Sequence, residues 1–73
     1  MRKSAALLKQ GETGVIRQFL DEQLSAKLLQ MGLLPGNEIQ LVRAAPLGCP
    51  LYLKSGGNYL ALRKTEAVNV IVE

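Results

Sequence analysis

Residues 28–50 read "LLQMGLLPGNEIQLVRAAPLGCP" and form the most hydrophobic region of the chain, which turn-forming residues interrupt twice. Gly32 follows directly after an apolar helical pattern, and the left-handed position that ends a helix favours glycine. Pro35 and Gly36 occupy the middle of Leu34-Pro35-Gly36-Asn37, which predicts a type II turn because proline presets φ and glycine accepts a positive φ. The first interruption therefore predicts a helix that gives way to a strand within about five residues.

The second interruption is the segment Pro46-Leu47-Gly48-Cys49-Pro50. Its two prolines cannot donate hydrogen bonds to a central ladder, so the segment predicts a tight loop between two strands. The preceding strand is predicted over residues 39–44. Its apolar alternation fails at Leu41-Val42, which indicates a bulge or burial on both faces.

A short amphipathic helix is predicted before Gly32. Asp21 is a residue type typical of an N-cap, and Glu22 places a negative charge in the first turn, where the helix dipole favours it. We expect Leu33 to fold back onto the helix after the glycine. The apolar stripe expected in the core, at positions i, i+4 and i+7, consists of Leu24, Leu28 and Met31.

The clearest hairpin signal is Gly56-Gly57 between residues 51–55 and 58–62. Two glycines between alternating segments are typical of a two-residue hairpin turn. This register places Leu53 opposite Leu60, and Leu51 opposite Leu62, on the inner side. On the outer side it places Lys54 opposite Tyr59, and Tyr52 opposite Ala61.

The remaining segments complete a small, mainly β fold. Residues 1–10 predict a short arm with a helical turn in its second half, residues 11–14 a turn, and residues 15–20 the first strand. Residues 63–67 predict a polar turn before a last strand whose inner face is lined by Val68, Val70 and Val72. Five short strands, with the helix inserted between the first and the second, close best as a small barrel that hides the strand edges.

Composition excludes several classes of protein. With 73 residues, of which 48% are apolar, the chain is long enough for one small domain, and no apolar run is long enough to cross a bilayer. The apolar run after Arg2-Lys3 is too short for a signal peptide, so we expect a cytoplasmic protein. The net charge of +3 is small, and the basic residues are spread along the chain instead of forming a block, which is weaker than the footprint of a strong nucleic-acid binder.

The sequence contains no catalytic or metal-binding constellation. Cys49 is the only cysteine, so no internal disulfide can form, and no histidine is present to activate it. The six carboxylates are scattered without metal-ligand spacing. Gly11-Glu12-Thr13-Gly14 is too short for a phosphate-binding loop and lacks its Lys-Ser/Thr. The sequence therefore predicts a protein that is not an enzyme and uses no cofactor or metal.

The surface features that remain are an outward patch and a loop. Tyr52, Lys54 and Tyr59 form the patch on the hairpin, and Arg63 follows the second strand on the same side. Ordinary cross-strand packing is the simpler interpretation of these side chains, and a platform for a protein partner or for stacked bases is the alternative. The loop from Pro46 to Pro50 could serve barrel closure or recognition of a partner.

Four segments together resemble the FeoA family, small cytosolic proteins of bacterial ferrous iron uptake. The family pattern runs Leu-x-x-Gly-x-x-Gly-x-Ile, a helix ending in Leu/Met-Gly-Leu-x-Pro-Gly, an Ala-Pro-x-Gly-x-Pro loop, and a strand ending in Ala-Leu-Arg before a Glu-Ala turn. Cys49 departs from the small or acidic residue expected in that loop, and Lys27 stands where an arginine is frequent. The matching segments are "LLKQGETGVI" (7–16), "LLQMGLLPG" (28–36), "RAAPLGCP" (43–50) and "LALRKTEAVNVIVE" (60–73).

The resemblance implies a single SH3-like domain over residues 1–73. It also implies an accessory or regulatory binding module, not an iron carrier, that docks on the cytosolic GTPase-containing part of the FeoB ferrous iron permease. Such a partner would recruit it to the inner face of the membrane. The expected docking residues are Tyr52, Lys54, Tyr59 and Arg63.

Two alternatives stay open at this point. The first is a small-barrel nucleic-acid binder, which the net positive charge and the two outward tyrosines permit. The second concerns mechanism, because a partner of GTPases can lend an arginine finger. The candidates for that role are Arg17, Arg43 and Arg63, of which Arg63 is best placed, although we expect docking to be its role.

Overall fold

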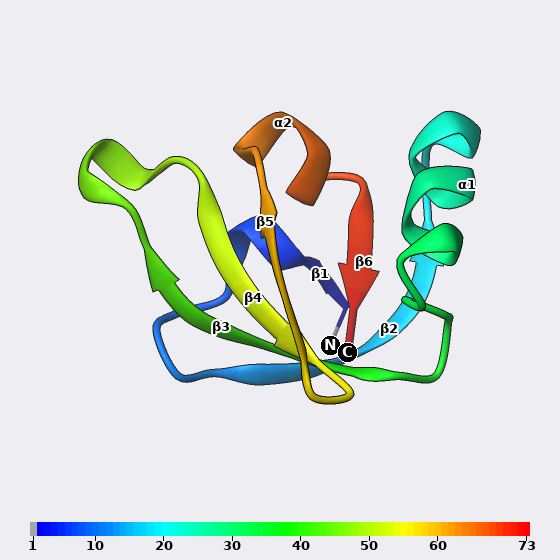
Figure 1. The fold of residues 1–73 in the computed structure, drawn as a ribbon, viewed down its shortest axis with the longest axis horizontal. Coiled ribbons are helices and arrows are strands. Elements are labelled where there is room, and N and C mark those ends of the chain that lie inside the picture. Colours follow the sequence, from blue (N-terminus) through cyan, green and yellow to red (C-terminus); the bar gives the residue numbers. More distant parts are fainter. Residues whose placement is uncertain (1) are drawn as a thin grey trace.

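The computed structural model describes residues 2–73 as one strongly curved antiparallel sheet with two short α-helices (Figure 1). The strands follow the order β1-β6-β2-β3-β4-β5, and every neighbouring pair is antiparallel. The predicted mainly β, SH3-like fold class is confirmed. The elements are β1 (Lys3–Ser4), the 3₁₀ helix η1 (Ala5–Leu7), β2 (Thr13–Phe19), α1 (Glu22–Gln30), β3 (Glu38–Ala44), the 3₁₀ turn η2 (Pro46–Gly48), β4 (Leu51–Ser55), β5 (Asn58–Leu62), α2 (Lys64–Ala67) and β6 (Val70–Val72).

The sheet has six strands instead of the predicted five because the N-terminal arm contributes β1. Lys3 and Ser4 pair with Val72 and Ile71 of β6. Two residues are too few to show an alternating pattern, so the sequence carries no signal for this strand. The predicted helical turn in the arm is present as η1, and its Ala5 is fully buried.

Gly14 lies inside β2, so the predicted turn at residues 11–14 is wrong at its C-terminal end. The turn centres on Gly11, which has φ +85°, and β2 already begins at Thr13. A Cβ atom placed on Gly14 would lie 3.0 Å from Cβ of Val72. The glycine therefore allows β2 and β6 to approach closely, a role for glycine within a strand.

Helix α1 begins as predicted at Asp21. Its Oδ1 accepts hydrogen bonds from the N–H groups of Gln23 and Leu24, at 2.8 and 3.1 Å. Leu24 and Leu28 are buried as predicted. Met31 is not buried, because the helix has already ended there. Its exposed fraction is 40%.

The helix ends with the predicted left-handed glycine. Gly32 has φ +86°, and its N–H donates to the carbonyl of Leu29 at 3.0 Å. The N–H of Leu33 donates to the carbonyl of Leu28 at 2.9 Å, which completes a Schellman motif. Leu33 then takes the buried place that the periodicity had assigned to Met31.

The turn predicted between the helix and β3, the bulge and the hairpin are all present. The N–H of Asn37 donates to the carbonyl of Leu34 at 3.0 Å, with Gly36 at φ +97°. The register of β3 shifts between Leu41 and Arg43, which is the bulge expected from the broken alternation. Every pairing predicted for the β4–β5 hairpin is present.

Lys64–Ala67 form α2 where residues 63–67 were predicted to form a polar turn. The carboxylate of Glu66 accepts a hydrogen bond from the backbone N–H of Arg63, the residue before the helix, at 3.0 Å, which helps to start the helix. Val68 lies at the end of this helix and is 48% exposed, so it does not line the core. Val70 and Val72 do line it, as predicted.

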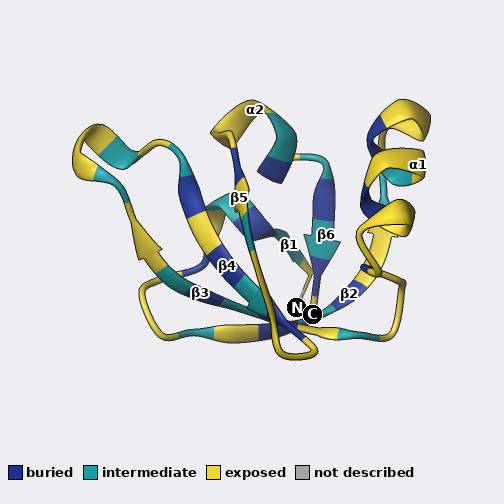
Figure 2. Ribbon diagram, viewed as in Figure 1, coloured by how far each residue is buried: buried dark blue, intermediate teal, exposed yellow. Residues whose placement is uncertain are grey.

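The strands curl around one hydrophobic core (Figure 2). Neither helix within residues 2–73 is long and apolar enough to cross a membrane. The buried core residues are Ala5, Leu8, Ile16, Leu24, Leu28, Leu33, Ile39, Leu41, Leu51, Leu53, Leu62, Ala67, Val70 and Val72.

Candidate docking surface

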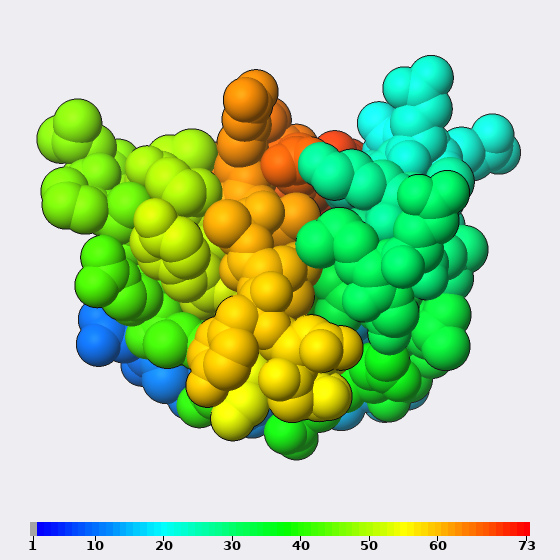
Figure 3. Space-filling view, in the orientation of Figure 1, coloured from blue at the N-terminus to red at the C-terminus, as the bar shows by residue number. Residues whose placement is uncertain are grey.

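The four residues predicted to bind a partner come together on the outward face of the β4–β5 hairpin. Lys54 pairs with Tyr59 across the hairpin, and Tyr52 pairs with Ala61. Arg63 continues the alternation of β5 in extended conformation, so it follows Tyr59 and Ala61 on that face. In Figure 3 the hairpin residues, from yellow to orange, run up the middle of the visible surface. We call the outward residues Arg43, Tyr52, Lys54, Tyr59 and Arg63 the tyrosine face.

A cation lies over each tyrosine ring. Cζ of Arg43 is 5.3 Å from the centre of the Tyr52 ring, and Nζ of Lys54 is 5.5 Å from the centre of the Tyr59 ring. Such exposed contacts contribute about 0.5–1 kcal/mol each and hold the rings in place. Tyr59 nevertheless remains 70% exposed. The face therefore presents two oriented rings and their cations at the surface.

Arg43 lies on this face although it was not predicted there. It pairs with Tyr52 only because the bulge in β3 shifts the register at that point. Without the bulge, strict alternation from Ile39 and Leu41 would turn Arg43 inward. The broken alternation at Leu41-Val42 was the signal that could have located it.

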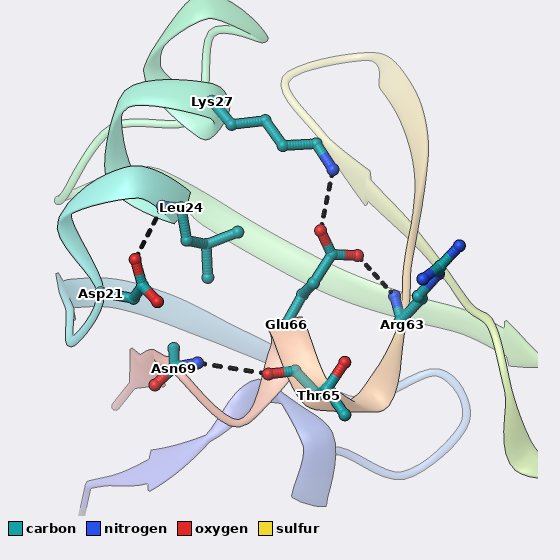
Figure 4. A network of polar contacts seen from close by, with 7 residues as sticks. All are labelled: Asp21, Leu24, Lys27, Arg63, Thr65, Glu66 and Asn69. Carbon is teal, nitrogen blue, oxygen red and sulfur yellow. Dashed lines mark hydrogen bonds and ion pairs between the residues drawn. The ribbon is translucent and has the colours of Figure 1, made fainter.

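Figure 4 shows how the polar network under α2 positions Arg63. The carboxylate of Glu66 accepts a hydrogen bond from the ammonium of Lys27 in α1 at 2.8 Å, and another from the backbone N–H of Arg63. These donors hold the pKa of Glu66 below its ordinary value, with the hydrogen bond from Lys27 as the largest cause. The guanidinium of Arg63 extends away from this carboxylate, so its charge is available at the surface.

The charges of the molecule are unevenly distributed. Residues 39–65 contain no acidic residue. None of the cations Arg43, Lys54, Arg63 and Lys64 belongs to a salt bridge formed within residues 2–73. The cations of the tyrosine face are therefore not paired with carboxylates within the described residues. The salt bridges join Glu73 with Arg2 and Arg17, Glu12 with Lys3, and Glu66 with Lys27.

An open groove of about 620 Å³ continues the tyrosine face around the tip of the hairpin. Lys54 belongs to its wall, opposite Glu38 and Gln40 of β3. Ser55 donates a hydrogen bond to the carbonyl of Glu38 at 2.6 Å and ties the two strands together there. The groove is polar and shallow, which suits a protein surface better than a small ligand.

The loop Pro46–Pro50, which we call the proline loop, is the tight loop predicted between β3 and β4. The N–H of Gly48 donates to the carbonyl of Ala45 at 2.8 Å, which closes a four-residue turn. Leu47 occupies its third position with φ +72° and ψ +7°, the geometry of a type II turn that normally takes glycine. A left-handed leucine costs about 1–2 kcal/mol. Its side chain is 102% exposed, so no burial offsets that cost.

The described residues hold no cluster of metal-ligand side chains. Within residues 2–73, no three of the histidine, cysteine, aspartate and glutamate side chains come together as metal ligands. Cys49 is an exposed free thiol in the proline loop.

Comparison with known protein families decides the assignment. The FeoA domain family matches residues 4–73. The chain belongs to the FeoA family. The resemblance of its four sequence segments is thus confirmed, and with it the link to ferrous iron transport.

Solved FeoA structures share the fold. An iron uptake regulatory protein (FeoA) is 30% identical, with a TM-score of 0.87 over 100% of this chain and 96% of that one. Iron(II) transport protein A of Clostridium thermocellum is 38% identical, with a TM-score of 0.88 over 96% of this chain but only 44% of that one. FeoA of Stenotrophomonas maltophilia, an SH3 domain protein complexed with zinc, is 27% identical, with a TM-score of 0.84 over 96% of this chain and 88% of that one.

The predicted turn residues lie in turns of this chain. Gly32 ends α1, Pro35 and Gly36 form the turn before β3, and Gly56 and Gly57 form the hairpin turn. Pro46, Gly48 and Pro50 shape the proline loop, which projects from the fold at the upper left of Figure 1. Leu47, at the tip of that loop, was singled out by neither composition nor periodicity.

Proposed function

We propose that residues 1–73 form a single, non-enzymatic accessory module of ferrous iron uptake that works in the cytoplasm. The module docks on the cytosolic GTPase-containing part of the FeoB permease, which brings it to the inner face of the membrane. One observation carries the proposal: the tyrosine face gathers two exposed, cation-braced rings on an FeoA fold. Tyrosine and arginine are the residues that most often dominate protein–protein binding.

The experiment is a pull-down from cell membranes with the tagged protein, followed by identification of the permease. The double variant Tyr52→Ala/Tyr59→Ala removes both rings, neither of which belongs to the core. We expect it to weaken capture about tenfold or more while the melting temperature changes little. The matched control is Tyr52→Phe/Tyr59→Phe, which keeps the rings and should retain most of the binding. Equal capture by wild type and the alanine variant would place the docking surface elsewhere.

Arg63 allows docking to be separated from direct catalysis. An arginine finger raises GTP hydrolysis about 10³–10⁵-fold. We expect Arg63→Ala to lower GTP turnover by the partner's soluble domain only as far as it lowers binding. The measurement is turnover at saturating amounts of wild type and variant. A large stimulation that vanishes with Arg63→Ala at full occupancy would replace docking with catalysis as its role.

The alternative of nucleic-acid binding is weaker on this geometry. Arg43 and Lys54 each cover one face of a tyrosine ring that stacked bases would otherwise use. A salt titration with single-stranded oligonucleotides tests it. Contacts to phosphates give an affinity that falls steeply with salt, whereas the docking module should show no measurable binding.

The module carries no iron of its own in this proposal. Its chain contains no histidine and a single, exposed cysteine. We expect calorimetry at neutral pH to show Fe(II) binding no tighter than that of an unrelated domain. The same titration with Zn(II) is informative, because the Stenotrophomonas relative was solved as a zinc complex. A stoichiometric Fe(II) site of micromolar affinity would overturn this part of the proposal.

A further inference from the structure

We propose that Leu47 is an anchor that inserts into an apolar pocket with a carboxylate rim on the protein partner. The inference rests on the proposed function, since the partner meant is the cytosolic part of the permease. It adds the element that makes contact first and names the chemistry of the pocket that receives it.

Exposure sets Leu47 apart from every other leucine described. Its exposed fraction is 102%, against 65% for Leu7, 59% for Leu20 and 47% for Leu34. In Figure 3 the segment that contains it projects at the upper left, away from the body of the molecule. Figure 2 shows most of this turn as exposed. A side chain in this position contributes nothing to the core of its own fold.

The backbone fixes the direction in which Leu47 points. Its φ of +72° lies in the region that glycine normally occupies in a type II turn. Hydrogen bonds hold the turn from within, from Gly48 to Ala45 at 2.8 Å and from Ala45 to Pro50 at 3.0 Å. Because Pro46 and Pro50 also restrict the loop, little freedom is lost when the leucine enters a pocket. The loop is thus preorganised for binding.

The charge around Leu47 indicates the rim of the pocket. A Cβ atom placed on Gly48 would lie 2.7 Å from Nζ of Lys64, so this ammonium lies against the turn. Arg43 and Tyr52, a cation–π pair, stand at the base of the loop. Since neither Arg43 nor Lys64 belongs to a salt bridge formed within residues 2–73, the positive charge beside the loop has no carboxylate partner there. Complementarity therefore calls for carboxylates around an apolar pocket.

A protein pocket fits these observations better than a lipid surface does. An exposed leucine with nearby cations could also enter an anionic bilayer. A fluid bilayer, however, accepts an apolar side chain in any direction and gains nothing from a strained, oriented backbone. A shaped pocket gains from both, because its contacts depend on the direction of approach.

The experiment measures binding of the purified chain to the purified cytosolic domain of the permease by calorimetry. Leu47→Asn and Leu47→Gly both accept the left-handed backbone and remove the apolar side chain. We expect each to weaken binding roughly 10- to 100-fold. We also expect each to melt at or above the temperature of wild type. Leu47→Met should restore most of the affinity. The matched control is Leu34→Ser, which removes the exposed leucine at the first position of the other proline turn and should bind as wild type.

Each outcome supports or overturns a stated part of the proposal. Binding of Leu47→Asn with unchanged affinity would overturn the anchor and leave the docking proposal standing. No binding by wild type would overturn docking, and the anchor with it. A lower melting temperature in both variants would show that Leu47 stabilises its own fold. Leu47-dependent binding to vesicles containing phosphatidylglycerol, without Leu47-dependent binding to the domain, would assign the leucine to the membrane.

Discussion

Two turns with the same geometry face opposite demands in this molecule. Both turns have proline at the second position and close with a hydrogen bond. The first is Leu34-Pro35-Gly36-Asn37, with a bond of 3.0 Å, and the second is Ala45-Pro46-Leu47-Gly48, with a bond of 2.8 Å. Their third residues both have positive φ, +97° at Gly36 and +72° at Leu47. The first turn has the residue that the geometry favours, and the second has one that it penalises.

The surroundings of the two turns differ in the same sense. The N–H of Gly36 donates to the carbonyl of Ile16 at 2.6 Å, and the carbonyl of Asn37 accepts from the N–H of Ile16 at 2.8 Å. The first turn is thus bonded to β2. The hydrogen bonds described for the proline loop stay within Ala45–Pro50. The turn that supports the fold is hydrogen-bonded to it and has the residue that its backbone favours. The turn that presents an exposed side chain has backbone strain that no burial of that side chain offsets.

The largest effect is expected at the helix end that leads into the first turn. Gly32→Val places a β-branched residue at φ +86° and disturbs the Schellman motif. We expect it to destabilise the fold by roughly 1–3 kcal/mol, or several degrees or more of melting temperature. Nothing lies within 4 Å of a Cβ there, so the effect is conformational and not a clash. Gly32→Asn, which tolerates positive φ, should lose less. An unchanged melting temperature for the valine variant would show that Gly32 is not left-handed.

Gly36→Leu converts the first turn into a copy of the second. No atom lies within 4 Å of a Cβ at Gly36, so strain alone sets the cost. We expect a loss of about 1–2 kcal/mol, measured by urea unfolding. Gly36→Asn should lose less than half of that. If the leucine variant were as stable as wild type, the comparison between the two turns would fail.

Leu47→Gly converts the second turn into a copy of the first. Relief of the left-handed strain should outweigh the greater flexibility of glycine in the unfolded chain. We expect a gain of about 0.5–1 kcal/mol in the free energy of unfolding, again by urea titration. Leu47→Ala keeps a Cβ at positive φ and should show no such gain. A destabilised glycine variant would mean that the leucine has a structural role.

The smallest effect concerns the link between α1 and α2. The pKa of Glu66 lies below its ordinary value of 4.5, mainly because Lys27 donates to it. The folded state therefore holds the ionised form, and its contribution is present above that value and lost as the pH falls through the lowered pKa. We expect Glu66→Gln to lower stability by about 0–1 kcal/mol at pH 7.

The measurement for this link is the difference in melting temperature between wild type and Glu66→Gln at pH 7 and at pH 3. The difference should shrink at the lower pH. Glu38→Gln, which removes a carboxylate outside the salt bridges of residues 2–73, should show no comparable change. A difference of equal size at both pH values would rule out the ion pair as its source.

Sequence reasoning succeeded where the signal is local. The glycine pair predicted the full register of the hairpin, and Asp21 and Gly32 predicted both ends of α1. The broken alternation at Leu41-Val42 predicted the bulge. In each case the residues that carry the signal adopt the conformation themselves, so neighbours in the chain are sufficient.

It failed where a helix ends inside an apolar pattern, where an element is too short to show a period, and where a distant contact decides. Met31 has the right spacing for the helical stripe, but the helix has ended there and Leu33 takes the buried place. The strand at Lys3–Ser4 exists only because β6 lies beside it. The helix at Lys64–Ala67 and the exposure of Val68 at its end were not predicted, because a four-residue helix is too short to show a period.

The sequence by itself determined the chain of turns, the hairpin, the helix ends and the tyrosines that face outward. These follow from φ preferences, capping and the two-residue period of a strand, which act over a few neighbouring residues. Only the tertiary structure decided that Arg43 braces Tyr52, that Lys64 lies against the proline loop, and that Leu47 has no cover. The exposure and the pairing of a side chain depend on which segments the curled sheet brings together. A pattern of neighbouring residues in the sequence does not encode which distant segments come into contact.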